Sequence, residues 1–314
     1  MKYIARKFAA LLLTMVLVSI LAFVAFNLIP GDPAQMILGT EATPESIAAL
    51  HAKLGLDQSL PQRYFSWLGG LLHGDMGTSL QYSQPVASLL FSRLPVTACL
   101  AGLSLIFIVA LSFPAGVFAA KWHGTLPGHL MDAVTMLNLT LPGFFFGVLF
   151  IWIFGILLHC FVPGAYIDYR QNFGGFLRYL IFPALAVALP NIASTAKFLR
   201  NAILAERNSA YAVTARSKGL SESAVLRRHV LKNAAVPAVT LLGMTVAEIF
   251  SGSIIIEQVF SLPGVGRLLI SAVSTRDFPM LESLVVYIAL LVTIANFVAD
   301  LVIRRIDPRM RQKA

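Results

Sequence analysis

The chain of 314 residues is poor in charge, since Asp, Glu, Lys and Arg make up only 12% of it. Soluble proteins average about a quarter. Hydrophobic residues reach 57%, and the mean hydropathy is +0.78. This composition excludes an ordinary soluble domain and predicts an integral membrane protein. The sequence also lacks a G-x-x-x-x-G-K-[ST] loop, so no recognisable ATP site is present.

Cysteine is scarce as well. Cys99 and Cys160 are too few for a disulfide framework or a metal cluster, and we interpret them as packing residues, with a single bridge as the alternative. The histidines are scattered and form no H-x3-H or comparable pair. No nucleophile–base arrangement or clustered carboxylates occur either. We therefore predict no metal site, no bound cofactor and no catalytic residues, so the chain is not expected to be an enzyme.

Long apolar runs dominate what is present. Six of them approach or exceed the roughly 20 residues that cross a hydrocarbon core as a helix, namely residues 8–29, 98–120, 133–158, 179–196, 236–256 and 283–299. The fourth run contains Pro183 and Pro190, which transmembrane helices tolerate. The first run is too long for a signal peptide and has no cleavage site, so we expect it to be retained. The predicted fold class is all-α, with six transmembrane helices.

The net charge of +9 comes from Lys and Arg gathered at both termini and in the fourth connection between runs. If six helices span, these regions lie on one side, which the positive-inside rule makes cytoplasmic. The same rule removes the need for a nucleic-acid partner. The long connection 30–96 belongs outside. It contains an expected helix at 44–54, capped by Thr43 with Pro44 first, and an apolar stretch at 64–72. There, Tyr64 and Trp67 either anchor the membrane surface or pack the outer helix ends.

The most unusual segment is a polar, basic insert at 208–239 that ends on Pro237, which we expect to disrupt a helix. We expect two helical stretches, 210–218 and 221–235, around Gly219 as a left-handed C-cap, with Ser221 and Glu222 starting the second. The result is a helix–turn–helix elbow in the cytoplasm. The simpler interpretation is a solvated loop that only sets topology. Small residues from Ala210 to Gly219 favour an elbow that another protein approaches closely.

The letters TARSKGLSESAVLRRHVLKNAAVP (214–237) resemble the cytoplasmic EAA loop of ABC importer permeases of the dipeptide, oligopeptide and nickel transporter family. Further resemblances cover nearly the whole chain: LIPGDP (28–33), LGLD (54–57), HGDMG (73–77), RLPVT (93–97), EQVFSLPGVGR (257–267), RDFP (276–279) and DPR (307–309). One departure stands at Val213, where the loop's name-giving glutamate is absent. No acidic docking contact is therefore expected from that position.

The resemblance implies a type I ABC importer permease fold in a bacterial or archaeal cytoplasmic (inner) membrane, with both termini cytoplasmic. Residues 1–29 would form the N-terminal tail and first span, 30–96 an extracytoplasmic segment, 97–306 the permease core with its coupling loop at 206–236, and 307–314 a cytoplasmic tail. Implied partners are a second homologous permease, two ATPase subunits that carry ATP and Mg, and an extracytoplasmic solute-binding protein. The implied ATPase-coupling residues are Ala212, Thr214, Ala215, Arg216, Lys218, Gly219 and Leu220.

A charge inside an apolar run is expensive and marks a functional candidate. Glu248 is the clearest such residue, and we interpret it with Met244 and Ser251 as part of the translocation path. The alternative is a hydrogen-bonded glutamate that ties helices together. The cargo stays open between di- or oligopeptides, glutathione, nickel and metal chelates. An ATP-independent carrier or an ion channel is the competing class, although neither a selectivity filter nor inverted repeats are evident.

Overall fold

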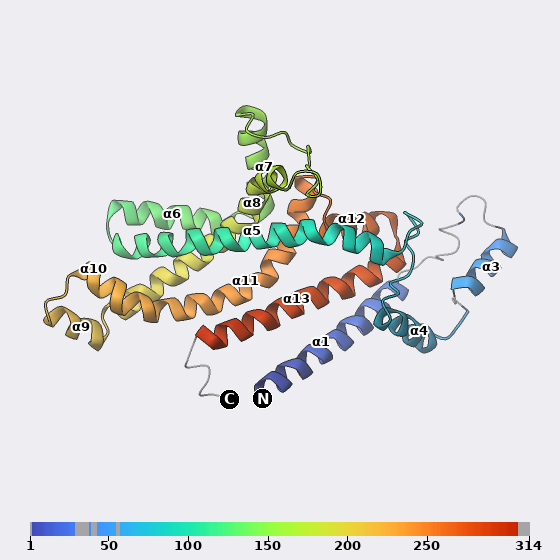
Figure 1. Cartoon of the computed structure of the whole chain (residues 1–314), viewed down its shortest axis with the longest axis horizontal. Coiled ribbons are helices and arrows are strands. Elements are labelled where there is room, and N and C mark those ends of the chain that lie inside the picture. Colours follow the sequence, from blue (N-terminus) through green and yellow to red (C-terminus); the bar gives the residue numbers. More distant parts are fainter. Residues whose placement is uncertain (1, 29–37, 39–42, 55–56, 307–314) are drawn as a thin grey trace. The chain divides into compact units, whose positions relative to one another are not determined.

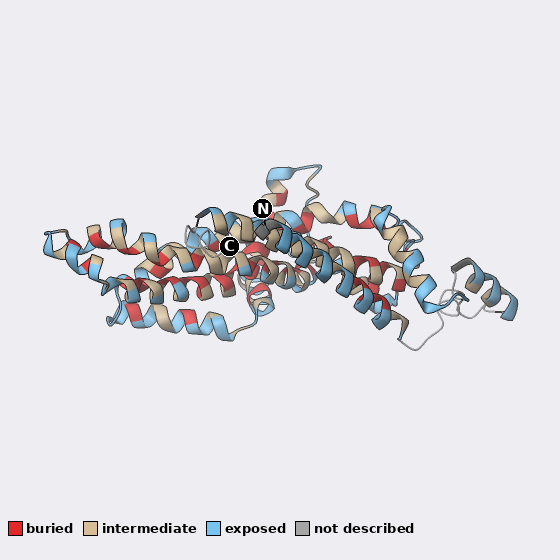
Figure 2. Cartoon of the chain, turned by 90° about the horizontal axis from the view of Figure 1, so that it is seen from below, coloured by how far each residue is buried: buried red, intermediate tan, exposed pale blue. Residues whose placement is uncertain are grey.

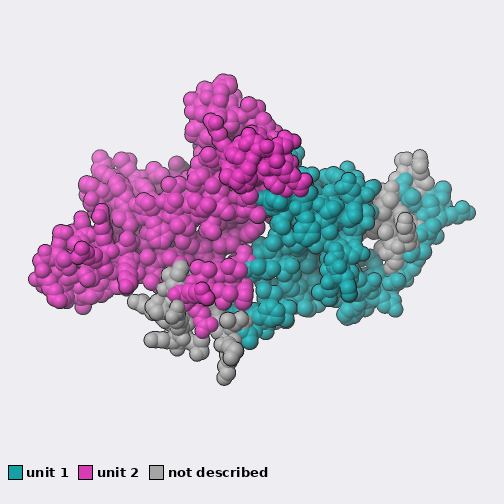
Figure 3. Space-filling view, in the orientation of Figure 1, with its two compact units in different colours: residues 1–95, 267–294 teal, residues 96–266, 295–314 magenta. Residues whose placement is uncertain are grey.

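The computed structural model describes residues 2–28, 38, 43–54 and 57–306. Within these residues the chain is helical and contains no strand longer than the isolated bridge between Thr78 and Pro85. The motifs at 28–33, 54–57 and 307–309 fall largely or wholly outside the described residues. The chain divides into two compact units, formed by residues 1–95 with 267–294 and by residues 96–266 with 295–314 (Figure 3).

Among the described residues, five helices are long and apolar enough to cross a membrane: Ala5–Asn27, Val86–Lys121, Phe173–Arg207, Glu222–Val259 and Phe278–Val302. They belong to α1 (Lys2–Asn27), α5 (Val86–Lys121), α8 (Phe173–Arg207), α11 (Leu231–Val259) and α13 (Phe278–Ile306), labelled in Figure 1. Figure 2 shows buried, intermediate and exposed residues distributed along the helices. On α1, large apolar side chains such as Leu13 and Leu21 are exposed, as a surface facing lipid requires.

The third expected span is not one straight helix. Residues 126–157 form α6 (Leu126–Thr140), α7 (Gly143–Phe150) and a π-helical segment (Ile151–Leu157), with a bend of 102° between α6 and α7. Pro142 lies at the break, and its ring prevents the preceding turn from continuing as a helix. The pair counts as a sixth span only if both arms are taken together. The fourth span is longer than predicted, because α8 continues through Pro183 and Pro190.

In the first unit, the expected helix α3 (Pro44–Leu54) is confirmed, and the Ser46 amide donates to Thr43 Oγ1 at 3.2 Å. The apolar stretch that follows forms α4 (Leu60–Leu72). Tyr64 and Trp67 pack against Phe23 of α1, with ring centroids 5.4 and 5.7 Å away. Of the two interpretations of these aromatics, the structure supports packing against a helix end.

The same unit brings together two motifs that lie far apart in the sequence. Asp277 of RDFP is buried and receives hydrogen bonds from Ser79 Oγ at 2.5 Å and from the Gln81 amide at 3.2 Å. Ser283 Oγ donates to the Met76 carbonyl at 2.8 Å. A buried carboxylate needs such donors, so Asp277 holds the turn that follows HGDMG against the start of α13.

The second unit is built around α8, which packs against α11, α7 and α6. Asn172 caps α8 by accepting from the Gly175 amide at 2.8 Å. One apolar core, including Leu180, Ile249 and Phe260, surrounds the first part of α8. A second core lies at its C-terminal end and includes the elbow. This second core positions the candidate site.

Candidate functional site

The elbow consists of two short helices joined by a tight turn. α9 (Ala210–Ser217) ends at Lys218, and Gly219 follows with a φ of +82°. The Gly219 amide donates to the Arg216 carbonyl and the Leu220 amide to the Ala215 carbonyl, as in glycine C-caps. Ser221 then caps α10 (Glu222–Val225) by accepting from the Ala224 amide. The predicted turn at Gly219 and the helix start at Ser221 are both confirmed.

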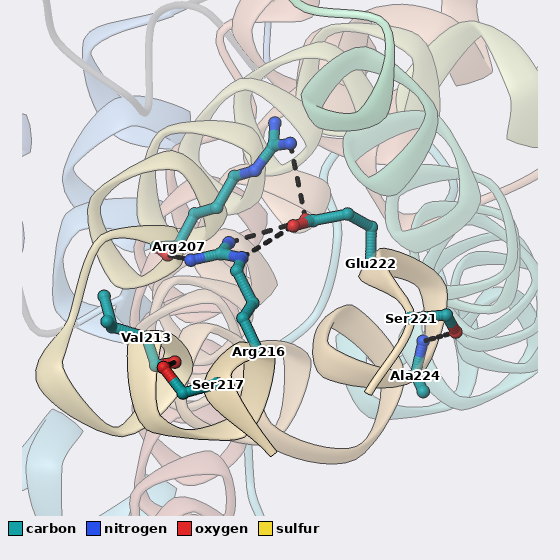
Figure 4. A network of polar contacts seen from close by, with 7 residues as sticks. All are labelled: Arg207, Val213, Arg216, Ser217, Ser221, Glu222 and Ala224. Atoms are coloured by element: carbon teal, nitrogen blue, oxygen red, sulfur yellow. Dashed lines mark hydrogen bonds and ion pairs between the residues drawn. The ribbon is translucent and has the colours of Figure 1, made fainter. Parts of the chain in front are cut away.

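A carboxylate joins the two sides of this turn. Glu222 Oε1 accepts from Arg216 Nε at 2.6 Å, and Glu222 Oε2 lies 3.4 Å from Nη2 of both Arg216 and Arg207. Arg216 also donates to the Arg207 carbonyl at 3.0 Å, so α8, α9 and α10 are held at one point (Figure 4). The hydrogen bond from Arg216 lowers the pKa of Glu222 below its ordinary value. We call these three residues the elbow clasp.

The small residues of α9 face inward. Ala212 is fully buried and Ala215 nearly so, in a core that includes Ile203, Val225 and Val230. Their small side chains therefore let helices of the same unit approach one another, and not only an external surface. Of the other expected coupling residues, Thr214, Lys218 and Gly219 are exposed, whereas Arg216 and Leu220 are partly buried. Val213, where the glutamate is missing, is 51% exposed.

The elbow continues directly into a membrane span. After α10 the chain makes one π-helical turn (Leu226–Val230) and enters α11, so that Glu222–Val259 forms one helical stretch of 38 residues. The expectation that the insert ends at a helix-disrupting Pro237 is wrong, because Pro237 lies inside α11. The packing of α11 against α8 offsets the hydrogen bond that a proline removes.

The expected path residues share one face of α11. Met244, Glu248 and Ser251 are all exposed in the single chain, and their spacing of four and three residues places them on one side of a helix. The opposite side, including Thr245, Ile249 and Ser253, is buried. Glu248 makes no hydrogen bond to another helix within the residues that the structure describes, and its role in the path stays a prediction.

Sequence reasoning did not single out Glu257, which is the most buried carboxylate of the second unit. Its side chain is 0% exposed, and its Oε1 accepts from Thr97 Oγ1 at 2.6 Å. The Val265 amide donates to the same Thr97 oxygen at 2.9 Å. A Cβ on Gly264 would overlap the Glu257 carboxyl group. The E-x6-G spacing within EQVFSLPGVGR could have indicated this contact, because only a glycine leaves room where the loop crosses the Glu257 carboxylate.

The candidate site consists of a turn, the elbow clasp and one face of α11. No three His, Cys, Asp or Glu side chains gather as a metal site in the part of the chain that the structure describes. The arrangement instead joins a surface-exposed turn to a membrane helix with a polar face. Such a connection can transmit movement between the two.

Two family profiles together match most of the chain. The profile described as binding-protein-dependent transport system inner membrane component matches residues 112–312, and that of its N-terminal part matches residues 1–101. A Brucella abortus protein provisionally named a peptide transport system permease protein is 35% identical over 308 residues, covering 98% of each chain. The glutathione transport system permease protein of Escherichia coli is 32% identical over 313 residues, covering 100% of each.

The fold has a solved counterpart in the MetNI methionine ABC transporter in inward facing conformations. The TM-score is 0.57 at 18% identity, over 70% of this chain and 96% of that chain. At that identity the match supports the fold alone. It agrees with the type I permease fold expected from the sequence, and the matches do not favour the channel or carrier alternative. The chain belongs to the binding-protein-dependent transport system inner membrane components and is a multi-pass inner-membrane permease of an ABC importer in the peptide and oligopeptide transporter family.

Proposed function

We propose that this chain forms one half of the translocation pathway of an ATP-driven importer, paired with a second homologous permease. Two ATPase subunits, which hold the ATP and Mg, bind on the cytoplasmic side, and a solute-binding protein delivers cargo from outside. The basic residues of the elbow and termini support this orientation, with both termini in the cytoplasm. The same charge pattern supports residues 30–96 as the extracytoplasmic segment and 206–236 as the coupling loop.

One observation carries the proposal: the second helix of the elbow and the fifth apolar span form a single helical stretch, Glu222–Val259. A movement of this second helix is therefore passed to α11 without a flexible joint, and the clasp between Arg216 and Glu222 links α9 to it. The ATPase contacts the exposed residues Thr214, Lys218 and Gly219. Ala212 and Ala215 contribute by packing α9 against its buried core, while Arg216 and Leu220 stabilise the turn.

A substitution at Gly219 tests this coupling. A Cβ at Gly219 would meet nothing within 4 Å, so the long side chain of Gly219→Arg points outward and blocks a partner without filling this chain's core. Gly164 provides a matched control, because it has a φ of +81° and the same open space, but lies in the connection before α8. Both variants carry the same backbone strain, so only the position differs.

We expect the purified Gly219→Arg transporter to reach the membrane in normal amounts and to lose both uptake and the stimulation of ATP hydrolysis by the loaded binding protein. Gly164→Arg retains both. Wild-type uptake by Gly219→Arg would remove the elbow from the mechanism. Equal loss in both variants would show that the strained turn, and not the docking surface, causes the defect.

For the cargo, we propose a small peptide-like solute. The named relatives are peptide and glutathione permeases, and their similarity extends over the whole chain. Met244, Glu248 and Ser251 supply a mixed face of thioether, carboxylate and hydroxyl to the path, and a carboxylate attracts a peptide amino group. Nickel and metal chelates remain the competing cargo.

Calorimetry on the associated solute-binding protein separates these cargoes. Di- and oligopeptides, glutathione, free nickel and nickel chelates are titrated in turn. We expect micromolar or tighter binding of at least one peptide, and of no nickel species. Tight binding of nickel or a chelate alone would refute the peptide assignment without affecting the coupling role of the elbow.

A further inference from the structure

A small hollow lies beside the elbow in the second unit. Its volume is about 80 Å³, and it is lined by the ends of α5 and α8 together with α9, α10 and the turn that follows. One ordered water needs roughly 10–15 Å³, so the hollow accommodates a larger group. The floor is apolar and buried, formed by Ala120, Ile203, Val225 and Val230.

The rim of the hollow is positively charged. Lys121, Arg207 and Arg216 contribute three cations, and Glu222 contributes one carboxylate, which leaves an excess of two positive charges. Glu222 is held most closely by Arg216, at 2.6 Å, while Arg207 lies 3.4 Å away and its side chain is 46% exposed. Lys121 comes from a different helix, with its Nζ 5.4 Å from the ring centre of Trp122. The rim therefore complements a small anionic group.

The hollow also lies next to the end of an apolar run. Ala120 is the last residue of the apolar run 98–120, and Lys121 and Trp122 follow directly. Tryptophan and lysine are the residue types found at the boundary between hydrocarbon and headgroups. Basic pockets between transmembrane helices on the cytoplasmic side suit acidic lipid headgroups.

We propose that this hollow binds the phosphate of an anionic phospholipid from the cytoplasmic leaflet, with Arg207 and Lys121 as its ligands. The apolar floor beneath the cations fits an amphiphile better than a fully polar anion. An acidic side chain of an ATPase would also be attracted by the cations. It would not account for the position of the hollow at the end of an apolar run, which a lipid does. The leaflet follows from the proposed function, whereas binding itself does not depend on ATPase coupling.

The test measures lipid binding to the full-length chain, purified in detergent with its partner subunits. Native mass spectrometry follows titration with dihexanoylphosphatidylglycerol, with dihexanoylphosphatidylcholine and inorganic phosphate as comparison ligands. The variants are Arg207→Gln and Lys121→Gln. Arg228→Gln is the matched control, since Arg228 is an exposed cation of the same elbow that does not line the hollow.

We expect phosphatidylglycerol to bind and phosphatidylcholine to bind at least tenfold more weakly. Arg207→Gln and Lys121→Gln should each weaken binding about fivefold, and Arg228→Gln should leave it unchanged. Because Lys121→Gln leaves the elbow clasp intact, its effect cannot come from a distorted turn.

Three results would overturn the proposal. Equal weakening by Arg228→Gln would indicate attraction to general surface charge. Inorganic phosphate binding as tightly as phosphatidylglycerol would indicate a soluble anion. If phosphatidylglycerol fails to protect the thiol of Ser223→Cys, at a position that lines the hollow without being a proposed ligand, while the assembled ATPase does protect it, the occupant is a protein side chain. A failed coupling test at Gly219 with intact lipid binding would refute the proposed function alone.

Discussion

The elbow clasp should couple Arg216 and Glu222 energetically. We consider the variants Arg216→Gln and Glu222→Gln and their combination. Both substitutions remove the charge; Glu222→Gln keeps the side-chain length, whereas Arg216→Gln shortens the side chain and removes the guanidinium. If the clasp holds the turn closed, each single variant raises the population of an open elbow. The double variant should then cost less than the sum of the two, because the shared interaction can be lost only once.

The magnitude follows from geometry and exposure. The Glu222 and Arg216 side chains are 58% and 28% exposed, and exposed pairs contribute roughly 0.2–1 kcal/mol. Two nitrogen–oxygen contacts, at 2.6 and 3.4 Å, place this pair near the upper limit, at about 1 kcal/mol or fivefold in a population. Glu222→Gln should cost more than Arg216→Gln, because it also removes the Arg207 pair and a carboxylate from the first turn of a helix.

Hydrogen exchange of the segment 214–226, measured on the intact transporter by mass spectrometry, reports this opening directly. We expect about fivefold faster exchange in Arg216→Gln, more in Glu222→Gln, and a coupling energy of about 0.5–1 kcal/mol from the cycle. Arg227→Gln changes an exposed cation in the π-helical segment that follows α10 and controls for net charge. Strictly additive single effects would refute the clasp.

The pH dependence gives the clasp a second test. Arg216 lowers the pKa of Glu222 below 4.5, so the pair stabilises the folded elbow above that value. The contribution is lost only as the pH falls through the lowered pKa. Glu222 should therefore cause no change in the hydrogen-exchange protection of the elbow between about pH 6 and about pH 8, once that protection is corrected for the intrinsic exchange rate. A loss of protection within that range would assign the elbow's stability to another titrating residue.

The remaining predictions concern single positions. Gly219→Ala should weaken ATPase stimulation only partly, because it adds about 1–2 kcal/mol of left-handed strain but no clash; complete loss would contradict this. Gly264→Ala should lower membrane yield sharply, since its Cβ overlaps the Glu257 carboxyl, and normal yield and melting temperature would contradict the close approach. Thr97→Val should cost about 1–3 kcal/mol, seen as a lower melting temperature in detergent. Glu248→Gln should leave that temperature unchanged while reducing uptake, because Glu248 is exposed; a lower melting temperature would assign it a structural role.

Local signals were sufficient for several elements. Thr43 with Pro44 predicted the start of α3, and Gly219 with Ser221 predicted the turn of the elbow, because capping depends on neighbours within a few residues. The bend after α6 had a local signal too, the Pro142-Gly143 pair. Within a long apolar run that signal was outweighed by hydropathy, because hydropathy indicates the length of an apolar segment but not whether its helix bends.

Contacts between distant residues could not be predicted in this way. Asp277 meets Ser79 across 198 residues, and Glu257 meets Thr97 across 160. The motifs containing Asp277, Glu257 and Thr97 were recognised separately, and Ser79 follows the HGDMG motif, but only the fold shows which of these residues face each other. The same holds for Ala215, whose small size was interpreted as access for a partner and is explained mainly by burial against Val225 and Val230.

The continuity of the elbow with α11 explains why a turn without an acidic residue at Val213 can still serve as a coupling element. A helical stretch of 38 residues is about 57 Å long at 1.5 Å per residue, so one element reaches from the clasp at Glu222 to the buried carboxylate at Glu257. Glu248 lies between these two anchors, on the face that the chain leaves exposed. Force applied at the turn needs no ion pair at Val213 to reach that face, provided that Glu222 keeps the turn rigid. Under the proposed function, we therefore infer that Glu222, on the other side of Gly219, takes the role of the missing glutamate.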